Sequence, residues 1–529
     1  MSEQRYYPFY LSLLCVLLFF PGLGGRDFWA PVEPRYAEIA RVMFIKGEWI
    51  IPMVNGDLYT DKPILYFWLV LIAAKIAGAV NEWTVRLPAA FGGVGFVLTT
   101  YFVGRDFFSA RIGLLAAAML ASSVRVIWEA RWAHIDALFC FFFLLSVYYA
   151  ARALLRKGSP NAILLAYVFM GLATLAKGLI GVVLPALLLV SFMIARRDWR
   201  MLGAAKLHLG IPIFLIVVAP WVVLVNAATE NRWLADFVNV HHIQRYTAGA
   251  GHRQPVFYYF TTLPVDLLPW TIFAIPALCA CRRVRGLMDE PAKIFVILWF
   301  VVVFLFFSAS DTKRDLYLMP LLPTIAIFIA HYIDDIDAGR LPQSALYRWL
   351  SLFFFTSIVV AGLGLPAAAW VLRRDVFWIS LPVAAVLAAG GGFAARYVLR
   401  EEPLKVVAAT TLMMTSTLLC AVLWIFPYIE VFKSRRPFSI ELKRIVPVTA
   451  TLYVYADTMN DFNFYTEREI IPVVATQPQL EGLLSQHSDS YLLVKERDFE
   501  KVHRVAKAKI IVSRPVGGNN WYLISLDGR

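Results

Sequence analysis

Charged and aromatic side chains gather in a few short segments of a chain that is otherwise apolar. They are Glu33, Arg35, Tyr59, Asp61, Lys62, Asp136, His241, His242, Arg245, Lys313 and Tyr317. Arginine and lysine bind phosphate groups, and tyrosine donates a hydrogen bond while its ring contacts an acyl chain. Carboxylates activate a nucleophile, hold a sugar hydroxyl or ligate a divalent metal. A sugar phosphate on a lipid carrier needs all of these groups at a membrane surface, so the set predicts a site for such a molecule.

Several of these polar positions also have a simpler interpretation when each is taken alone. Glu38 and Arg41 are three residues apart and are expected to pair on a solvated helix face. The Tyr59–Pro63 segment is consistent with a turn, and Asp136 is consistent with a helix cap at the membrane interface. The joint placement of the polar residues, rather than any single residue, indicates a site.

The composition indicates which elements must position these side chains. Of the 529 residues, 60% are hydrophobic and 16% are charged, against about 25% charged in a soluble domain. Apolar runs recur nearly to residue 426, and a membrane-spanning helix needs about 20 such residues. The first run, at residues 10–23, is not followed by a small-residue cleavage site, so we expect a retained helix. The sequence therefore predicts an α-helical polytopic membrane protein.

The formal charge of +13 does not indicate a nucleic-acid-binding protein. The basic residues are scattered between the apolar runs, where they orient the chain and contact anionic membrane lipids. The five cysteines all lie in or beside apolar runs, so a disulfide framework is not expected. Cys279 and Cys281 resemble half of a metal-binding motif, but the sequence has no second half.

The positive-inside rule gives a predicted topology, because a basic cluster recurs after every second apolar run. We expect about 13 spans, with the N-terminus in the cytoplasm and the C-terminus outside. Their predicted starts lie near residues 10, 83, 112, 136, 161, 179, 208, 256, 293, 315, 348, 376 and 404. The run at Lys62–Gly78 is short and carries Lys75 near its end, so we expect an in-plane helix. The Glu33–Trp49 segment is predicted to be an amphipathic helix at the outer interface, with Pro34 in its first turn.

The composition changes near residue 427. Residues 1–426 form the predicted membrane domain, which includes a first outer loop at residues 24–82. Beyond it the apolar runs shorten to strand length, at Thr451–Ala456, Glu469–Val474, Tyr491–Glu496 and Lys509–Ser513. Helix-like stretches intervene, and the Gly517–Trp521 segment is typical of a hairpin turn. Residues 427–529 are therefore predicted to form a small α/β domain outside the membrane.

The Glu33–Trp68 segment, which begins EPRYAEIARVM and ends with YTDKPILYFW, resembles the first outer loop of the bacterial aminoarabinose transferases that modify lipid A. The resemblance continues at Trp132–Phe139, His241–Tyr259 and Ser308–Pro323. These proteins are GT-C-fold glycosyltransferases that depend on polyprenyl phosphate and are related to the protein O-mannosyltransferases. The resemblance implies transfer of aminoarabinose, or a similar sugar, from undecaprenyl phosphate to an envelope acceptor such as lipid A phosphate. We expect this transfer to be a direct, inverting displacement. It also implies a bacterial inner-membrane protein whose active site and C-terminal domain are periplasmic.

The resemblance also implies a role for each matching residue. Those expected to surround the donor phosphate are Lys62, Arg35, Tyr36, Tyr59, His242, Arg245 and Tyr317. Lys313 lies where the family often has a lysine before this tyrosine. Asp61 takes an acidic position that in the family lies beside a divalent metal. Glu33 and Asp136 are the candidate catalytic acids.

One position departs from the family pattern. The family usually has Asp-Glu before Pro-Arg-Tyr, whereas this chain has Val32 followed by Glu33. A phosphate acceptor is already anionic and attacks without a strong base, whereas a serine or threonine hydroxyl needs proton removal. Val32 therefore favours a phosphate acceptor, unless the activity is altered or lost.

Two other functions are consistent with the sequence. The first is a mannosyl-type transferase that uses another polyprenyl-phosphate sugar and acts on protein or polysaccharide. The second is a lipid-sugar transporter or an envelope scaffold. A transporter usually carries ionisable residues near the middle of its spans, and the predicted spans have almost none there.

Overall fold

The structure is a computed structural model that describes residues 3–155, 158–240, 253–281, 290–457, 460–485, 490–506 and 509–526. The chain divides into two compact units. Residues 1–21, 60–66 and 88–424 form the first, which we call the helical unit. Residues 22–59, 67–87 and 425–529 form the second, which contains helices and strands and which we call the mixed unit.

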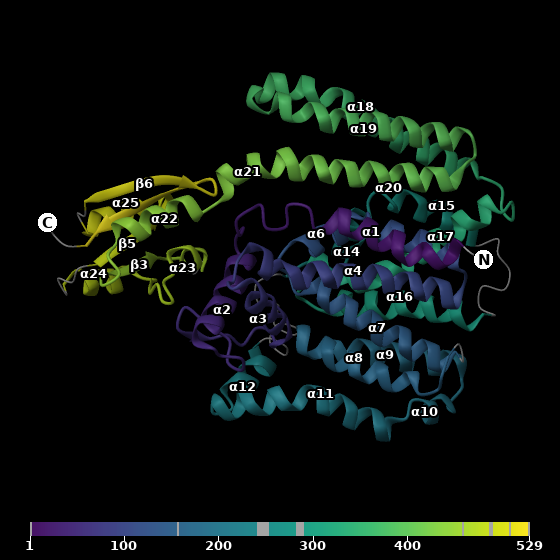
Figure 1. Cartoon of the computed structure of the whole chain (residues 1–529), viewed down its shortest axis with the longest axis horizontal. Helices are drawn as coiled ribbons and strands as arrows, with labels where there is room; N and C mark the ends of the chain where they lie inside the picture. The colour runs from purple at the N-terminus through teal and green to yellow at the C-terminus, as the bar shows by residue number, and fades with distance from the viewer. Residues whose placement is uncertain are drawn as a thin grey trace. The chain divides into compact units, whose positions relative to one another are not determined.

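The helical unit is built from the apolar runs of the sequence, because a backbone surrounded by lipid satisfies its hydrogen bonds only in a helix or a closed barrel. Its main helices are α1 (Tyr7–Phe19), α4 (Glu82–Phe107), α5 (Ala110–Ala121), α6 (Val124–Arg131), α7 (Asp136–Leu154), α8 (Ala162–Lys177), α9 (Ile180–Arg196), α11 (Leu207–Ala228), α14 (Tyr258–Asp266), α15 (Thr271–Cys281), α16 (Pro291–Ala309), α17 (Leu322–Asp337), α18 (Ala345–Leu372), α19 (Phe377–Leu399) and α20 (Pro403–Cys420) (Figure 1). The first turns of α4, residues 82–87, belong to the mixed unit. Shorter helical segments are η1 (Glu3–Tyr6), α10 (Met201–Ala204), α12 (Arg232–Val238), η3 (Asp315–Leu321) and η4 (Arg374–Val376). A helix begins within a few residues of every predicted start, so the assignment of the apolar runs to helices is confirmed.

The lengths of these helices bear on the number of spans. Eight of the described helices are long and apolar enough to cross a membrane, or ten if each of two bent pairs is one span. The α5–α6 pair bends by 64° and the α14–α15 pair by 109°. The helices α8 and α9 are shorter, and α1 has 13 residues. The expected number of about 13 spans therefore requires these three helices to cross as well.

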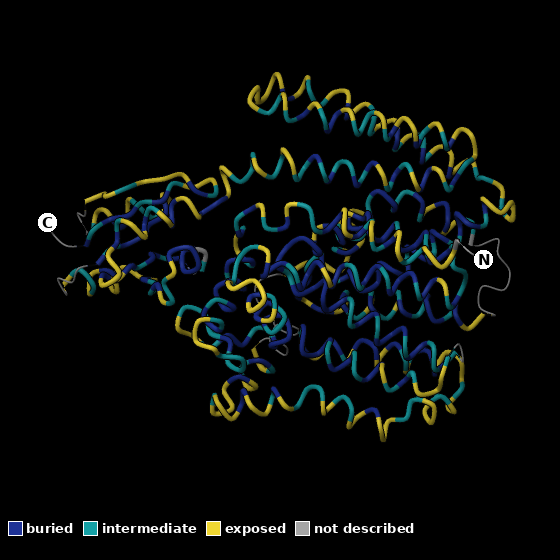
Figure 2. Tube along the Cα trace, in the orientation of Figure 1, coloured by how far each residue is buried: buried dark blue, intermediate teal, exposed yellow. Residues whose placement is uncertain are grey.

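Many residues along α11, α18 and α19 are exposed or half-buried (Figure 2). Large apolar residues are among the exposed ones. On α18, Trp349 is 72% exposed and Phe353 is 75% exposed, and on α19 Trp378 is 75% exposed. Large apolar side chains on helices of this length are suited to contact with lipid. The chain is therefore a polytopic α-helical membrane protein.

A glycine determines how two helices meet close to a predicted site residue. A Cβ atom on Gly92 of α4 would lie 2.6 Å from the Cα atom of Leu138 in α7. This is closer than any side chain allows, so α4 packs against the first turn of α7 only because residue 92 is glycine. Asp136 begins α7, and the close packing fixes its position relative to α4.

The mixed unit contains the first loop region and the C-terminal region. The elements of the loop region are α2 (Val32–Lys46), β1 (Met53–Val54), β2 (Asp57–Leu58) and most of α3 (Leu65–Ala77). The elements of the C-terminal region are η5 (Ala421–Ile425, at the junction with the helical unit), α21 (Phe426–Lys433), α22 (Arg436–Ile445), β3 (Thr451–Tyr455), α23 (Asp461–Thr466), β4 (Val473–Val474), α24 (Gln477–Leu484), β5 (Ser490–Lys495), α25 (Glu496–Ala506), β6 (Ile510–Val516) and β7 (Asn519–Ser525). The short β1–β2 hairpin turns at Asn55 and Gly56, whose φ angles are 53° and 84°, as two-residue hairpin turns require.

The C-terminal region forms a five-stranded sheet in the order β4-β3-β5-β7-β6. Strand β3 is parallel to β4 and β5, and β7 lies antiparallel between β5 and β6. Side chains from alternate strand positions form an apolar core on each face, one around Trp521 and Leu493 and the other around Leu492 and Ile524. The four predicted strands are confirmed as β3 to β6, and β7 is a further strand after the predicted hairpin turn.

Hydrogen bonds tie the loop region to the C-terminal region within the mixed unit. The backbone N–H of Ile471 donates to Asn55 Oδ1 at 2.7 Å, and Asn55 Nδ2 donates to the Ile471 carbonyl at 3.1 Å. The backbone N–H of Phe28 donates to the Tyr465 hydroxyl at 2.8 Å. These contacts set the loop that leads into α2 and the hairpin that follows it.

Candidate active site

The structure divides the predicted site residues between the two units. Glu33, Arg35, Tyr36 and Tyr59 lie in the mixed unit, whereas Asp61, Lys62, Asp136, Lys313 and Tyr317 lie in the helical unit. His242 and Arg245 lie outside the described residues.

Glu33 is held in the first turn of α2 by a buried group of ion pairs. Arg26 donates to its two carboxylate oxygens at 2.6 and 3.0 Å, and Arg86 donates to them at 2.7 and 2.9 Å. The backbone N–H of Trp29 donates to the same carboxylate at 3.1 Å. Burial alone would raise the pKa of Glu33, but the two guanidinium groups hold it well below its ordinary value. A carboxylate of such low basicity is poorly suited to accept a proton.

Arg86 extends this group into the loop that precedes α2. Its guanidinium donates to the backbone carbonyls of Leu23, Arg26 and Asp27 at 2.7, 2.8 and 2.8 Å. The side chain is completely buried. The loop is therefore folded around one guanidinium whose charge Glu33 balances, and this arrangement fixes the entry into α2.

The other predicted site residues of the mixed unit are near Glu33 in sequence or in the hairpin that follows α2. Arg35 is partly exposed, and the described part of the chain offers it no hydrogen-bond or ion-pair partner. Tyr36 and Tyr59 are buried and pack against Phe67, with ring centroids 5.6 and 6.1 Å from the centroid of that ring. The near-perpendicular rings form a rigid aromatic cluster. This packing fixes the first turns of α2, the helix that carries Arg35.

A pair in this helix was expected on a solvated face. Glu38 and Arg41 form the predicted pair, with two hydrogen bonds of 2.7 Å. The expectation of a solvated face is wrong for Glu38, which is completely buried. Burial raises the pKa of Glu38 to about 7, although Arg41 acts against the rise.

Asp61 and Lys62 form an adjacent ion pair in the helical unit, with 3.2 Å between Lys62 Nζ and Asp61 Oδ1. Among the described residues, no group of three or more His, Cys, Asp or Glu side chains is placed to hold a metal ion. Since Mg²⁺ is often held by one or two carboxylates together with substrate phosphates, the expected metal beside Asp61 stays a prediction. In the structure Asp61 is a counter-ion of Lys62.

Asp136 and Tyr317 are brought together by Lys177, a residue that sequence reasoning missed. Lys177 ends α8, and its ammonium forms an ion pair with Asp136, the first residue of α7. The same ammonium lies 5.0 Å from the centroid of the Tyr317 ring. The Asp136 and Lys177 side chains are only 11% and 8% exposed. The observed N-cap of α7 is Ile135, so the interpretation of Asp136 as a simple cap is wrong.

A second group of charges holds the elements around this cluster. Arg125 of α6 donates to Asp266 Oδ1 at 2.7 Å and to Glu129 Oε1 at 3.2 Å, and it also forms an ion pair with Asp315. Glu129 Oε2 lies 2.7 Å from His134 Nδ1. Arg125 thereby connects α6 and α14 with η3, the segment that carries Tyr317.

Lys313 is buried, and its ammonium donates to the backbone carbonyls of Gln254, at 3.2 Å, and Ser310. These bonds connect the segment before η3 to the segment before α14. Two of the three ammonium hydrogens thus bond to backbone carbonyls. Lys313 therefore holds together the two loops that precede α14 and Tyr317.

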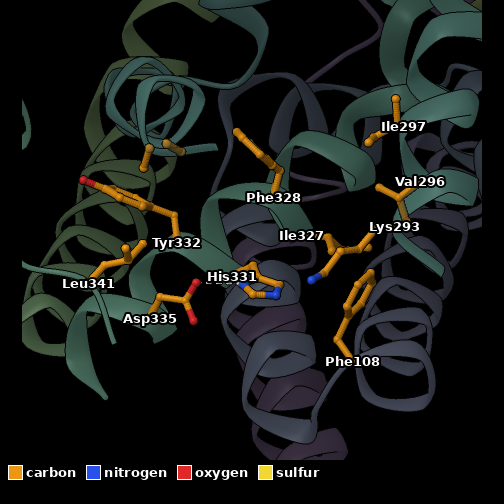
Figure 3. A pocket seen from close by; sticks show the side chains of 12 residues that line it. Phe108, Lys293, Val296, Ile297, Ile327, Phe328, His331, Tyr332, Asp335 and Leu341 are labelled. Carbon is orange, nitrogen blue, oxygen red and sulfur yellow. Dashed lines mark hydrogen bonds and ion pairs between the residues drawn. The ribbon is translucent and has the colours of Figure 1, made fainter. Parts of the chain in front are cut away.

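A cavity of about 100 Å³ lies elsewhere in the helical unit, and none of the described site residues lines it (Figure 3). Its walls are apolar, with Phe108 and Phe328 among them, and its polar residues include His331, whose Nδ1 lies 3.2 Å from Asp335 Oδ2. It is therefore distinct from the candidate active site.

The membrane-length helices, together with the small C-terminal sheet, make up the GT-C fold of membrane glycosyltransferases, as a solved structure of that class shows. The fold matches the crystal structure of ArnT from Cupriavidus metallidurans bound to undecaprenyl phosphate, with a TM-score of 0.79, 20% identity and 98% of both chains covered. The archaeal oligosaccharyltransferase AglB from Archaeoglobus fulgidus is more distant, with a TM-score of 0.58, 12% identity and coverage of 94% of this chain and 70% of that chain.

Relatives in sequence identify the branch of the GT-C class to which the chain belongs. A protein of Shewanella sediminis, named undecaprenyl phosphate-alpha-4-amino-4-deoxy-L-arabinose arabinosyl transferase, is 30% identical over 481 residues, which cover 87% of this chain and 84% of the relative. A protein of the same name from Pseudomonas aeruginosa is 30% identical over 419 residues, or 76% of this chain and 74% of the relative. A family model described as dolichyl-phosphate-mannose-protein mannosyltransferase matches residues 61–224. The chain belongs to the undecaprenyl phosphate-aminoarabinose arabinosyl transferase family.

Proposed function

We propose that the protein transfers 4-amino-4-deoxy-L-arabinose from undecaprenyl phosphate to a phosphate group of lipid A. The observation that carries the proposal is the cluster of Asp136, Lys177 and Tyr317, which gathers a buried acid, a cation and a phenol at the ends of membrane helices. The relatives named above supply the sugar and its carrier, and the solved ArnT from Cupriavidus metallidurans contains undecaprenyl phosphate.

The proposed location is the periplasmic face of a bacterial inner membrane. Described residues of the predicted basic clusters lie at the opposite helix ends, such as Arg152 in the last turn of α7 and Arg196 at the end of α9. Loops and helix ends rich in lysine and arginine stay on the cytoplasmic side. Arg111, for example, follows α4 and forms ion pairs with Asp334 and Asp337 at the end of α17. Asp136 and Lys177 lie at the other ends of their helices, on the side that this rule assigns to the periplasm.

The proposed reaction is a direct displacement with inversion. An oxygen of the lipid A phosphate attacks the anomeric carbon, and the bond from that carbon to the undecaprenyl phosphate oxygen breaks. The acceptor changes from a phosphate monoester to a diester and loses one negative charge, while the departing undecaprenyl phosphate gains one. The enzyme therefore has to stabilise charge on the leaving phosphate, for which we assign Lys62, Lys177 and Tyr317.

Asp136 has a positioning role in this proposal. Its carboxylate keeps the Lys177 ammonium charged and directed, at a place where an isolated ammonium would be poorly solvated. The predicted contacts of Arg35, Tyr36, Tyr59, His242, Arg245 and Lys313 with the donor phosphate are part of the same proposal. We assign Glu33 to the anchoring of α2 rather than to acid–base chemistry.

Val32 is compatible with this reaction. The attacking phosphate is already ionised at neutral pH, so the displacement needs no base at the position where the family usually has aspartate. A hydroxyl acceptor would need one. The proposed acceptor therefore accounts for the valine.

A mannosyl-type transfer to protein is the second candidate, because the matching model for residues 61–224 describes protein mannosyltransferases. Purified protein in lipid nanodiscs should be incubated with undecaprenyl phosphate-aminoarabinose or a polyprenyl phosphate mannose, each with lipid A or an envelope protein fraction. Mass spectrometry should detect the aminoarabinose mass only on lipid A that retains its phosphates. Mannose on protein, or no product with any pair, would refute the proposal.

A further inference from the structure

A cavity of about 550 Å³ lies within the mixed unit, and none of the predicted site residues lines it. Its lining comes from four elements: the end of α2, the segment between α3 and α4, one face of α22 and the end of α23. This volume is in the range of pockets that hold small molecules, about 300–1,000 Å³.

The walls of the cavity carry three cations and two carboxylates. The cations are Arg41, Arg436 and Lys443, and the carboxylates are Glu82 and Glu467. Arg41 is paired with Glu38 and Arg436 with Asp27, two carboxylates outside the lining, whereas the partner of Lys443, Glu467, lies in the lining itself. Cations that converge from two helices are suited to a phosphate, and neighbouring carboxylates are suited to sugar hydroxyls and amides.

Of the cations of α22, Lys443 can exchange its partner most readily. The Lys443 side chain is 45% exposed and pairs with Glu467, which is 63% exposed, at 2.6 Å. Arg436 is 51% exposed and lies 3.1 Å from Asp27 and 3.7 Å from Glu82. An ion pair between two exposed groups, such as Lys443 and Glu467, contributes little to stability, so a phosphate can replace Glu467 as the partner of Lys443 at small cost. Asp27 and Glu82 are each only 15% exposed, so Arg436 keeps these partners.

The rim of the cavity is apolar. Ile45 of α2 is 68% exposed and Ile440 of α22 is 39% exposed. Ile440 lies one helical turn from both Arg436 and Lys443 on the same face. Phe44 and Phe464 also line the cavity. An anionic sugar inside and an acyl chain across the rim would satisfy both kinds of surface.

We propose that this cavity binds the phosphorylated sugar headgroup of the acceptor glycolipid, with its acyl chains against Ile45 and Ile440. The inference rests on the proposed function, because it names the acceptor site for that transfer. The occupant is an anionic glycolipid rather than a free phosphate or an ordinary phospholipid, since the cavity combines phosphate-binding cations and sugar-binding carboxylates with an apolar rim.

The test uses the full-length protein in nanodiscs. Lys443→Gln should raise the KM for lipid A by about 3- to 10-fold, the effect of losing one ordinary net hydrogen bond from a half-exposed side chain. The KM for the donor and kcat should not change. Ile440→Ser should act in the same direction through the acyl chains. Lys501→Gln, on the exposed face of α25 with its side chain 73% exposed, removes the same charge and should change nothing.

A binding assay without donor separates this inference from the proposed transfer. Wild-type protein should bind lipid A with both phosphates more tightly than dephosphorylated lipid A, deacylated headgroup or phosphatidylglycerol, and Lys443→Gln should weaken that binding. Equal affinities of wild type and both variants for lipid A would overturn the site, even if transfer occurs. Tight binding that Lys443→Gln weakens, together with no transfer, would retain the site and overturn the proposed reaction.

Discussion

The ion pair between Asp136 and Lys177 should behave as a single functional group. Because both side chains are about one-tenth exposed, the value for a surface pair does not apply. Removal of one partner from a buried pair costs about 3–5 kcal/mol, since the other charge is left uncompensated. If the whole loss appears as weaker stabilisation of the transition state by Lys177, kcat/KM decreases by roughly two to four orders of magnitude.

The assay is a double-mutant cycle of Asp136→Asn, Lys177→Met and the double variant, with kcat/KM and thermal unfolding measured for each. The double variant should be no worse than the worse single variant, with a coupling of about 3 kcal/mol. Glu500→Gln, whose carboxylate and Arg504 partner are about 80% exposed, should leave both measurements unchanged. Additive losses in the double variant would refute the reasoning, because they would mean that the two residues act separately.

Three further predictions concern the start of α2. Glu33→Gln should lower the unfolding temperature at pH 7. The stability difference from wild type should shrink only as pH falls below about 4.3, because the pKa of Glu33 in the folded protein lies below that unfolded value. A stability difference that stays constant down to pH 3 would contradict this. Wild-type stability should decline as pH rises from about 4.3 to about 7, the pKa of Glu38 in the folded protein. Glu38→Gln should flatten this decline. An unchanged pH profile in the variant would contradict the assignment of the decline to Glu38. Val32→Asp should leave transfer to lipid A within about threefold of wild type, whereas a gain near 100-fold, typical of a general base, would show that the missing acid matters.

The positions of the helices were predictable because hydropathy is a local property of the chain. An apolar run in lipid has to form a helix, so a helix begins near each predicted start. The strands of the C-terminal sheet followed from short apolar runs in the same way. The β1–β2 hairpin was missed although the Asn55-Gly56 pair is a strong turn signal, because the segment was interpreted only as loop.

The contacts of the site were not predictable from local patterns. Asp136 and Lys177 are 41 positions apart in sequence, and Glu33 and Arg86 are 53 apart. Which acid meets which cation depends on the packing of helices, and no local pattern encodes that. A usable signal did exist, since a cation at the end or in the early turns of an apolar helix requires a partner. Applied to Arg86 and Lys177, that rule would have marked both residues.

The hydrogen bonds from Phe28 to Tyr465 and from Ile471 to Asn55 bear on how this protein can be re-engineered. A C-terminal segment exchanged for that of a relative would need a hydroxyl at position 465 and a free backbone amide at position 471. These groups bond to Phe28 and Asn55 of the first loop region. Without them the graft could form its own sheet and still leave α2 misplaced. The C-terminal region should therefore not be exchanged alone between relatives. Chimeras should exchange it together with residues 22–59.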